Sequence, residues 1–232
     1  MLLQARLTMK KRVQQILTDL ERVQESLIAL SDDIWLNIDH NNSDTLEEEV
    51  KLKVKFNKKL VEFHNIACDI ADSIEHFTKV SPQPADVGTV GTLEYTRILT
   101  ELERTRRYTL EEDFTFKRPY GFIFQGQAYK GINTWRNLYH LFCKQLASKN
   151  LSSFQEFIQN REAKTIKVGA MFAKESNSLR APLQITDDIY AEGNLSANSI
   201  RDRIKILLSA FGVDSQEMSL YLSQDRSLAE ES

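Results

Sequence analysis

The sequence contains few of the residues that interrupt regular structure. Among its 232 residues there are 8 Gly and 4 Pro. A β-sandwich needs frequent tight turns, so this scarcity argues against one and favours helices. Apolar residues make up 41% of the chain and charged residues 27%, which is ordinary for a protein with a buried core. The length suits one large domain or two small ones.

Cysteine is also scarce. Cys68 and Cys143 lie far apart, and each falls in a helical pattern, so two buried thiols in a reducing compartment are expected rather than a disulfide framework. The sequence contains neither CxxC nor HExxH, and its histidines lie on separate segments. We therefore expect no metal site and no cofactor. The four histidines are His40, His64, His76 and His140.

Long hydrophobic runs are missing as well. No run approaches the roughly 20 apolar residues that span a bilayer. The opening stretch MLLQARLTMKKRV lacks an apolar segment long enough for a signal peptide. The sequence therefore predicts a cytoplasmic protein without a membrane partner.

The net charge of −3 is unevenly distributed. Residues 1–113 hold 15 Lys and Arg against 21 Asp and Glu, a net of −6. Residues 114–226 hold 15 against 10, a net of +5, and the tail 227–232 adds −2. A mildly basic C-terminal half is compatible with nucleic acid, but it is weaker than the signature of a dedicated DNA binder.

Two heptad repeats dominate residues 1–79. Each keeps alternating spacings of three and four residues without a break, which is typical of a coiled coil. The first is Val13, Ile16, Leu20, Val23, Leu27, Leu30 and Ile34, and the second is Phe56, Leu60, Phe63, Ala67, Ile70, Ile74 and Phe77. Between them lies NIDHNNSDTLEEE, where Ser43 or Asp44 can cap the second helix. The pattern predicts an antiparallel helical hairpin.

Such a hairpin has more apolar residues than two helices can bury, because Leu17, Ile28 and Ile66 lie off the heptads. A third element is needed. We favour a second copy of the hairpin, since long seams of this kind are common dimerisation devices. The alternative is an intramolecular bundle completed by residues 92–110.

The remaining chain predicts a linker with a third helix, residues 80–113, and then a small domain, residues 114–226. Two prolines and two glycines fall within VSPQPADVGTVG. After residue 114 the pattern reads β-β-α-α-β-β-α-β, with a hairpin turn at Gln125-Gly126, helix caps at Thr134 and Ser196, and a strand over 165–173. The predicted fold class is α+β: an N-terminal antiparallel coiled-coil hairpin plus a small C-terminal α+β domain.

The stretches FKRPYGFIFQGQAYKGINTWRNLYHLFCKQL and IYAEGNLSANSIRDRIKILLSAFGV carry a resemblance. Over about residues 114–222 the chain resembles a small bacterial domain found at the C-terminal ends of otherwise different proteins of restriction-like, anti-phage and mobile-element systems. Glu192-x-Asn194-Leu195-Ser196-Ala197-Asn198 is its most specific part, and Gly193 departs from it where Thr is usual. The resemblance implies a bacterial defence setting and no particular mechanism.

Catalytic motifs are largely missing. The sequence lacks GxxxxGK[ST], GxGxxG and GxSxG. A metal-dependent nuclease needs clustered carboxylates and a lysine. Glu162-Ala163-Lys164 supplies such a triplet, and Asp187, Asp188 and Glu192 are further carboxylates. The triplet follows a helix and loop rather than lying inside a strand, so nuclease activity ranks third among the hypotheses.

Nucleic-acid binding has more support. The helix that begins near Ser196 brings cations and backbone amides to one end, which is a suitable seat for a phosphate. The predicted contact residues are Arg118, Lys130, Arg136, Asn194, Ser196, Asn198, Arg201 and Lys205. The alternative is that Ser196 only caps, Asn194 only turns the chain, and the cations form a solvated face.

These observations predict a non-enzymatic, oligomeric protein that associates with nucleic acid in a bacterial defence or mobile-element system. The second hypothesis is an adaptor or scaffold for a protein partner. In both, the heptad residues of 1–79 mediate oligomerisation.

Overall fold

The computed structural model describes residues 2–80, 85–149, 151–159 and 171–223. The chain divides into two compact units, Met1–Pro84 and Ala85–Ser232. The first unit is a helical hairpin and the second combines helices with antiparallel sheets, which confirms the predicted α+β class. Within the described ranges, no helix combines the length and the apolarity that crossing a bilayer requires.

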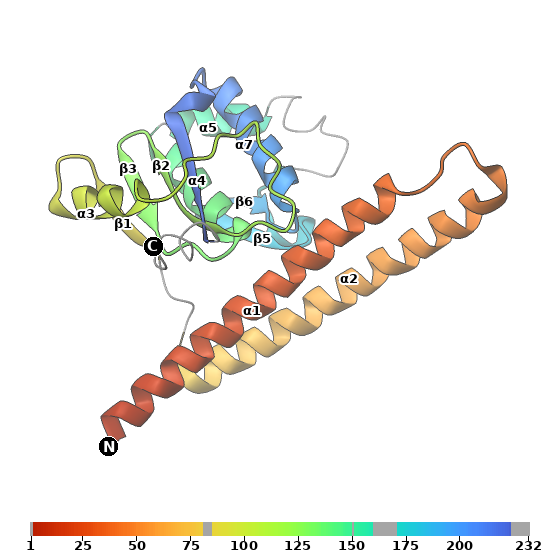
Figure 1. Ribbon diagram of the computed structural model, residues 1–232, viewed down its shortest axis with the longest axis horizontal. Coiled ribbons are helices and arrows are strands. Elements are labelled where there is room, and N and C mark those ends of the chain that lie inside the picture. The colour runs from red at the N-terminus through yellow and green to blue at the C-terminus, as the bar shows by residue number, and fades with distance from the viewer. Residues whose placement is uncertain (1, 81–84, 150, 160–170, 224–232) are drawn as a thin grey trace. The chain divides into compact units, whose positions relative to one another are not determined.

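The hairpin consists of two long antiparallel helices, α1 (Leu2–Leu36) and α2 (Ser43–Thr78) (Figure 1). Asn42 caps α2, because its backbone is extended and its side chain accepts a hydrogen bond from the Asp44 amide at 3.1 Å. The predicted cap at Ser43 or Asp44 is therefore wrong by one residue. Both of those residues already have helical backbone, and Asn42 is the last residue outside the helix.

Hydrogen-bonded side chains set the register of the hairpin. Gln24 Nε2 lies 2.7 Å from His64 Nδ1, and Ser31 Oγ donates to Asn57 Oδ1 at 2.8 Å. The residue numbers in each pair sum to 88, so a residue of α1 lies opposite the α2 residue that completes this sum. Leu17 obeys the same rule, because Ala71 packs against its cluster.

This pairing seam differs in part from the predicted one, since Val13 and Ala67 of the predicted heptads are buried but other heptad residues are not. The residues between the helices come one position after predicted heptad residues: Leu17 after Ile16, and Gln24 after Val23. Ile16 and Val23 are 47% and 48% exposed, and Leu30 is 41% exposed. The correction has a simple cause. The apolar arc of each helix is wider than one helix–helix contact, and the two helices meet along its edge.

The second unit is built on a four-stranded antiparallel sheet in the order β1-β3-β2-β7. Its strands are β1 (Asp86–Thr89), β2 (Pro119–Phe124), β3 (Gln127–Lys130) and β7 (Met218–Leu222). The predicted turn joins β2 to β3, with positive φ at both Gln125 and Gly126. Two consecutive residues with positive φ are what a tight hairpin turn requires.

Helices cover both faces of this sheet. On one face lies α3 (Leu93–Leu102), whose Ile98 and Leu102 are fully buried. The other face packs on α4 (Trp135–Lys149) and α7 (Ala197–Ala210). Thr134 begins α4 and Ser196 begins α7, as predicted.

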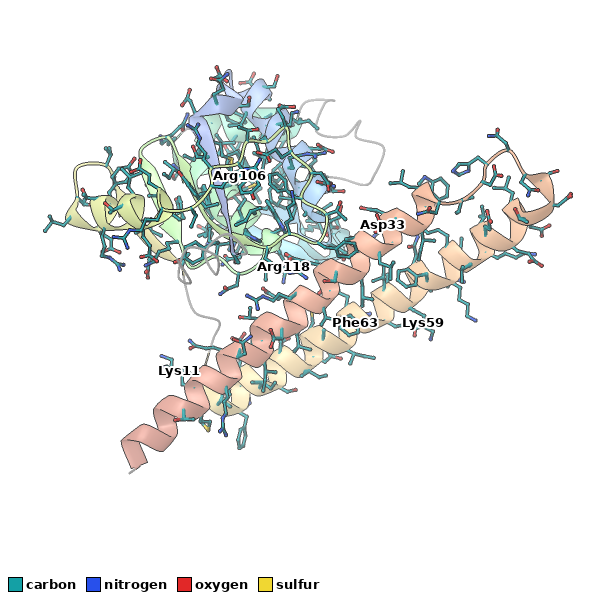
Figure 2. The ribbon with its side chains drawn as sticks, viewed as in Figure 1. Lys11, Asp33, Lys59, Phe63, Arg106 and Arg118 are labelled. Carbon is teal, nitrogen blue, oxygen red and sulfur yellow. The ribbon has the colours of Figure 1, made fainter. Side chains whose placement is uncertain are left out.

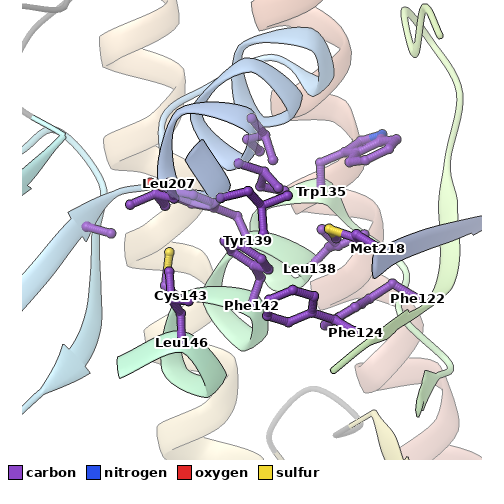
Figure 3. Packing of buried hydrophobic residues seen from close by; sticks show 14 of the residues in the cluster. Phe122, Phe124, Trp135, Leu138, Tyr139, Phe142, Cys143, Leu146, Leu207 and Met218 are labelled. Atoms are coloured by element: carbon purple, nitrogen blue, oxygen red, sulfur yellow. The ribbon is translucent and has the colours of Figure 1, made fainter. Parts of the chain in front are cut away.

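Aromatic side chains fill the core between the sheet and α4 (Figure 3). Phe124 and Phe142 meet with ring centroids 5.0 Å apart, and Phe122 stacks on Tyr129 at 4.3 Å. The indole of Trp135 donates to the Lys117 carbonyl at 2.8 Å, so its polar atom is satisfied where it is buried. Burial of several aromatic rings gives this unit a complete hydrophobic core.

A second, three-stranded sheet has the order β4-β6-β5. It contains β4 (Phe172–Ala173), β5 (Pro182–Thr186) and β6 (Ile189–Glu192). Phe172 at its edge meets Phe154 of α5 (Leu151–Gln159) in an edge-to-face contact. Short 3-10 turns at Ser176–Ser178 and Ser215–Glu217 complete the unit.

The structure revises the predicted segment 80–113. Residues 86–89 form β1, which pairs with β3, so a part of the predicted linker belongs to the sheet. The third helix ends at Leu102, and residues 103–118 run on without a further helix. The predicted strand over 165–173 lies mostly outside the described residues, apart from β4 at its end.

Candidate functional site

The predicted anion seat at the start of α7 is occupied by the protein's own side chains. The hydroxyl of Ser196 accepts a hydrogen bond from the Ser199 amide at 3.3 Å, and Ser196 is only 4% exposed. Ser196 is therefore a helix cap, as the alternative interpretation stated. Asn194 does not adopt positive φ, so it does not act as a left-handed turn residue.

Asn198 ties the start of α7 to the loop before β2. Its Oδ1 accepts from the Phe114 amide at 2.9 Å, and its Nδ2 donates to Asp113 Oδ1 at 2.6 Å and to Thr115 Oγ1 at 2.9 Å. The Asp113 carboxylate accepts hydrogen bonds from the side chains of Asn198 and Thr115, and these bonds, the one from Asn198 first, lower its pKa. Both the oxygen and the nitrogen of the Asn198 side-chain amide therefore form hydrogen bonds within the protein.

The two α7 cations that were predicted to contact nucleic acid, Arg201 and Lys205, bind the same loop. Arg201 Nη1 donates to the Glu112 carbonyl at 2.9 Å, and Arg201 Nε donates to Asp202 at 2.8 Å. Lys205 Nζ lies 2.7 Å from Glu111 Oε2. The structure brings Asn198, Arg201 and Lys205 together, as expected, but their partners are protein atoms.

The other three predicted cations lie on different elements. Lys130 of β3 is half-buried beside α3, with Nζ 2.7 Å from Glu101 Oε2. Arg136 of α4 reaches the Pro182 carbonyl of β5 at 3.5 Å. Arg118 is half-buried, and its carbonyl accepts from the Ser223 amide. These three residues and the α7 cluster do not occupy a single element, so the predicted set divides into separate local roles.

Glu192 has a structural position. Its carboxylate accepts hydrogen bonds from three backbone amides, those of Arg180, Ala181 and Asn194, at 2.7–3.1 Å. The neighbouring glycine is equally constrained, since a Cβ on Gly193 would lie 2.9 Å from the Ala181 carbonyl oxygen. Gly193 is therefore required by close packing and not by a turn, and this fold has no room for the threonine of the resembled domain.

The remaining carboxylates do not form a metal site within the described part of the chain. Asp187 and Asp188 are exposed, and Asp188 accepts a hydrogen bond from Thr186. No group of three metal-ligating side chains occurs among the described residues. Glu162 and Lys164, the triplet of the nuclease hypothesis, lie outside them.

Cys143 is fully buried and free. Burial raises the pKa of this thiol far above its usual value, so it stays protonated. Burial also raises the pKa of Tyr139, its neighbour on α4. A nucleophilic role requires a thiolate, and this environment opposes one.

Phe116 has a conformation that the sequence did not indicate. Its φ is +57°, in the left-handed region, and its side chain is 54% exposed. It lies inside a turn closed by the hydrogen bond from the Lys117 amide to the Phe114 carbonyl. A phenylalanine in this region costs about 1–2 kcal/mol relative to right-handed backbone. The turn therefore presents an aromatic ring and two neighbouring cations, Lys117 and Arg118.

An exposed apolar stripe lies on the hairpin, and we call it the apolar face. On each helix it consists of the residues that come one position before the residues of the pairing seam in the sequence. Because the helices are antiparallel, equal rotations away from their shared seam bring both stripes to the same side. The apolar face comprises Met9, Ile16, Val23 and Leu30 of α1 and Phe56, Phe63, Ile70 and Phe77 of α2.

Exposure and composition distinguish this side from the other. Phe77 is 89% exposed and Ile70 is 42% exposed, and Figure 2 shows Phe63 of the same stripe. The positions one residue after the seam, on the opposite side, are all polar. They are Thr18, Glu25 and Asp32 of α1 and Lys58, Asn65 and Asp72 of α2. The hairpin thus leaves this apolar stripe uncovered by its own two helices, and further large apolar residues outside the stripe, such as Trp35, Val54 and Val61, are exposed to a similar extent.

Comparisons with protein-family models, with curated proteins and with solved structures find no match to this chain. The resemblance of residues 114–222 to a bacterial defence-associated domain therefore stays a prediction. The arguments below rest on the chemistry of the chain itself.

Proposed function

We propose that this is a non-enzymatic assembly protein of the cytoplasm, which oligomerises through the apolar face of its hairpin and carries the second unit as a compact module. The observation that carries the proposal is a set of eight regularly spaced apolar positions on one side of α1 and α2, of which six are exposed and two, Phe56 and Phe63, are half-buried. Monomeric proteins rarely leave a continuous apolar surface of this kind open to water, because covering it is favourable by about 25 cal/mol per Å².

The heptad spacing specifies the kind of partner. Side chains repeated every seven residues form rows that interdigitate with another helix of similar spacing. A second copy of the same hairpin meets this requirement and is present wherever the first is. The resemblance of residues 114–222 suggests the setting, an oligomeric component of a bacterial defence or mobile-element system.

The decisive experiment is a measured mass in solution for two matched variants. Val23 and Asn65 lie at the same level of the hairpin, because their numbers sum to 88, but on opposite sides. We expect wild-type protein and Asn65→Lys to sediment as oligomers, whereas Val23→Lys dissociates. A monomeric wild-type protein, or equal behaviour of the two variants, would exclude the apolar face as the assembly surface.

Nucleic acid remains a second proposed ligand, and the turn at Phe116 favours it. An exposed aromatic ring beside Lys117 and Arg118 could stack on a base while the cations contact phosphates. We expect weak binding of single-stranded DNA that falls steeply with added salt, and a loss of binding in Phe116→Ser. Binding that is unaffected by Phe116→Ser would remove this turn from the proposal, and no retention at low salt would remove the ligand.

A further inference from the structure

We propose that two hairpins pack face to face around a two-fold axis perpendicular to the helices, with α1 against α1 and α2 against α2, each pair antiparallel. This arrangement rests on the proposed function, since it specifies how the apolar face is covered. It also makes that surface isologous, so the same residues serve both copies.

The dimensions of the apolar face fit a second hairpin. From Met9 to Leu30 the α1 stripe extends about 32 Å at 1.5 Å per residue. The α2 stripe, Phe56 to Phe77, has the same number of residues and covers nearly the same levels. A partner must therefore offer two long apolar helices side by side, which is what a second copy presents.

The α1 heptads complement themselves when reversed. In an antiparallel pair whose facing residue numbers sum to 43, Ile16 meets Leu27 and Leu20 meets Val23, while Leu30 comes to the level of Val13, which is buried within its own hairpin. The two-fold axis then passes between positions 21 and 22. Leu20 and Leu27 are only partly buried within the hairpin, so they have surface left to contribute.

The α2 stripe fits the same axis. The level between positions 21 and 22 of α1 lies opposite the level between 66 and 67 of α2, by the register of the hairpin. Reversal about this point places Phe56 against Phe77 and Phe63 against Ile70. A single axis therefore suits both helices, as a two-fold dimer requires.

Charges at the edge of the α1 stripe also complement themselves. The flanking positions, one residue before Val13 and one before Ile34, are Arg12 and Asp33. Reversal brings Arg12 of one copy to Asp33 of the other, and the dimer contains this pair twice. Figure 2 shows Lys11 and Asp33 near opposite ends of α1, which is the separation that an antiparallel pair needs.

The competing arrangement places α1 on α2 of the other copy, with the two-fold axis along the helices. In this competing arrangement, the residues that flank the apolar stripes of α1 and α2 fit less well. Asp19 would then lie near Ile66, which is 57% exposed and flanks the α2 stripe, so a carboxylate would border an apolar side chain. In the proposed arrangement Ile66 instead meets Ile66 of the second copy.

A charge swap tests the register on the full-length protein. Arg12→Glu and Asp33→Arg should each weaken the dimer about tenfold, because each places like charges together at two symmetric points. The double variant Arg12→Glu with Asp33→Arg should restore the wild-type dissociation constant, measured by analytical ultracentrifugation at low salt. Lys58→Glu, on the polar side, is the matched control and should leave the dimer unchanged.

The outcomes separate this inference from the proposed function. Restoration in the double variant supports the antiparallel α1 pair. Dimers that ignore both single changes, or that the double variant fails to restore, overturn the register while the assembly function stands. A wild-type protein that is monomeric at every concentration overturns both.

Discussion

The two units of this protein differ in the size of their apolar cores and in how much apolar surface they leave exposed. Within the hairpin, the residues between the helices include hydrogen-bonding and charged groups, and large apolar residues face outward. The buried polar residues are Gln24, Glu25, Ser31, Lys53 and His64. Within the second unit, fully buried aromatic and aliphatic side chains form a large core beside a few buried polar groups such as Glu192 and Arg203, and exposed large apolar residues are few among those described.

This difference is in keeping with the proposed function, in which a second hairpin covers the apolar surface that the first leaves exposed. Lys53 illustrates the contrast: its ammonium reaches the Ser31 carbonyl, and burial lowers its pKa. A stable helical pair would normally place apolar residues at such positions. The hairpin instead keeps its most apolar surface outside, which is the expected arrangement for one half of a larger helical bundle.

The strongest test of this comparison concerns the core of the second unit, which we expect to be the main source of that unit's stability. Phe142→Ala removes a fully buried ring that packs on Phe124. We expect the free energy of unfolding of this unit to fall by about 3–5 kcal/mol. Guanidinium denaturation followed by Trp135 fluorescence measures it, and a loss below 1 kcal/mol would contradict the described packing.

Removal of the Asn198 side chain should have an intermediate effect. Asn198→Ala leaves the Phe114 amide without its acceptor, and we expect a loss of about 1–3 kcal/mol in thermal or chemical denaturation. Gln184→Ala, at an exposed position of the same unit, is the control and should change stability little.

The same variant should alter the pH dependence of stability. The pKa of Asp113 is lowered in the folded protein, so the carboxylate stabilises the fold above its unfolded pKa of about 3.9, and this stabilisation is lost as pH falls below that value. Without Asn198 the loss between about pH 4 and the folded pKa should be smaller. Identical acid profiles for wild type and Asn198→Ala would contradict the assignment of the shift.

The smallest effect is expected inside the hairpin. His64→Leu alone removes the hydrogen bond between Gln24 and His64 and should cost about 1–2 kcal/mol, whereas Gln24→Leu with His64→Leu replaces both partners of that bond and should be nearly neutral. Helical circular dichroism on heating measures both variants. A double variant much less stable than the single one would show that this polar pair stabilises the hairpin.

Local signals in the sequence were sufficient for much of the fold. Thr134 and Ser196 cap their helices, Gly126 lies in the tight turn between β2 and β3, and Gly212 has positive φ after α7, all as the residue types indicate. The strand β1 was missed because its pairing with β3 depends on residues some forty positions away. Four residues with an internal glycine carry no pattern that separates a strand from a linker.

The candidate sites were harder to predict, because charge pattern does not reveal partners. Arg201 and Lys205 share a helical face, as expected, but Glu111 and the Glu112 carbonyl come from a loop ninety residues earlier. The prediction of the residues between α1 and α2 was only partly correct, for a related reason. Periodicity locates an apolar arc on each helix but not which edge of that arc the partner helix contacts.

The end of α2 has a consequence for spacing. Lys79 adopts a left-handed conformation, and its amide closes on the Glu75 carbonyl, which fixes where the chain leaves the hairpin. In the proposed two-fold dimer, the two exits would lie at opposite ends of the bundle, about 40 Å apart along its axis at 1.5 Å per residue. The dimer would thus set a fixed distance between the two points at which the chains leave the hairpins.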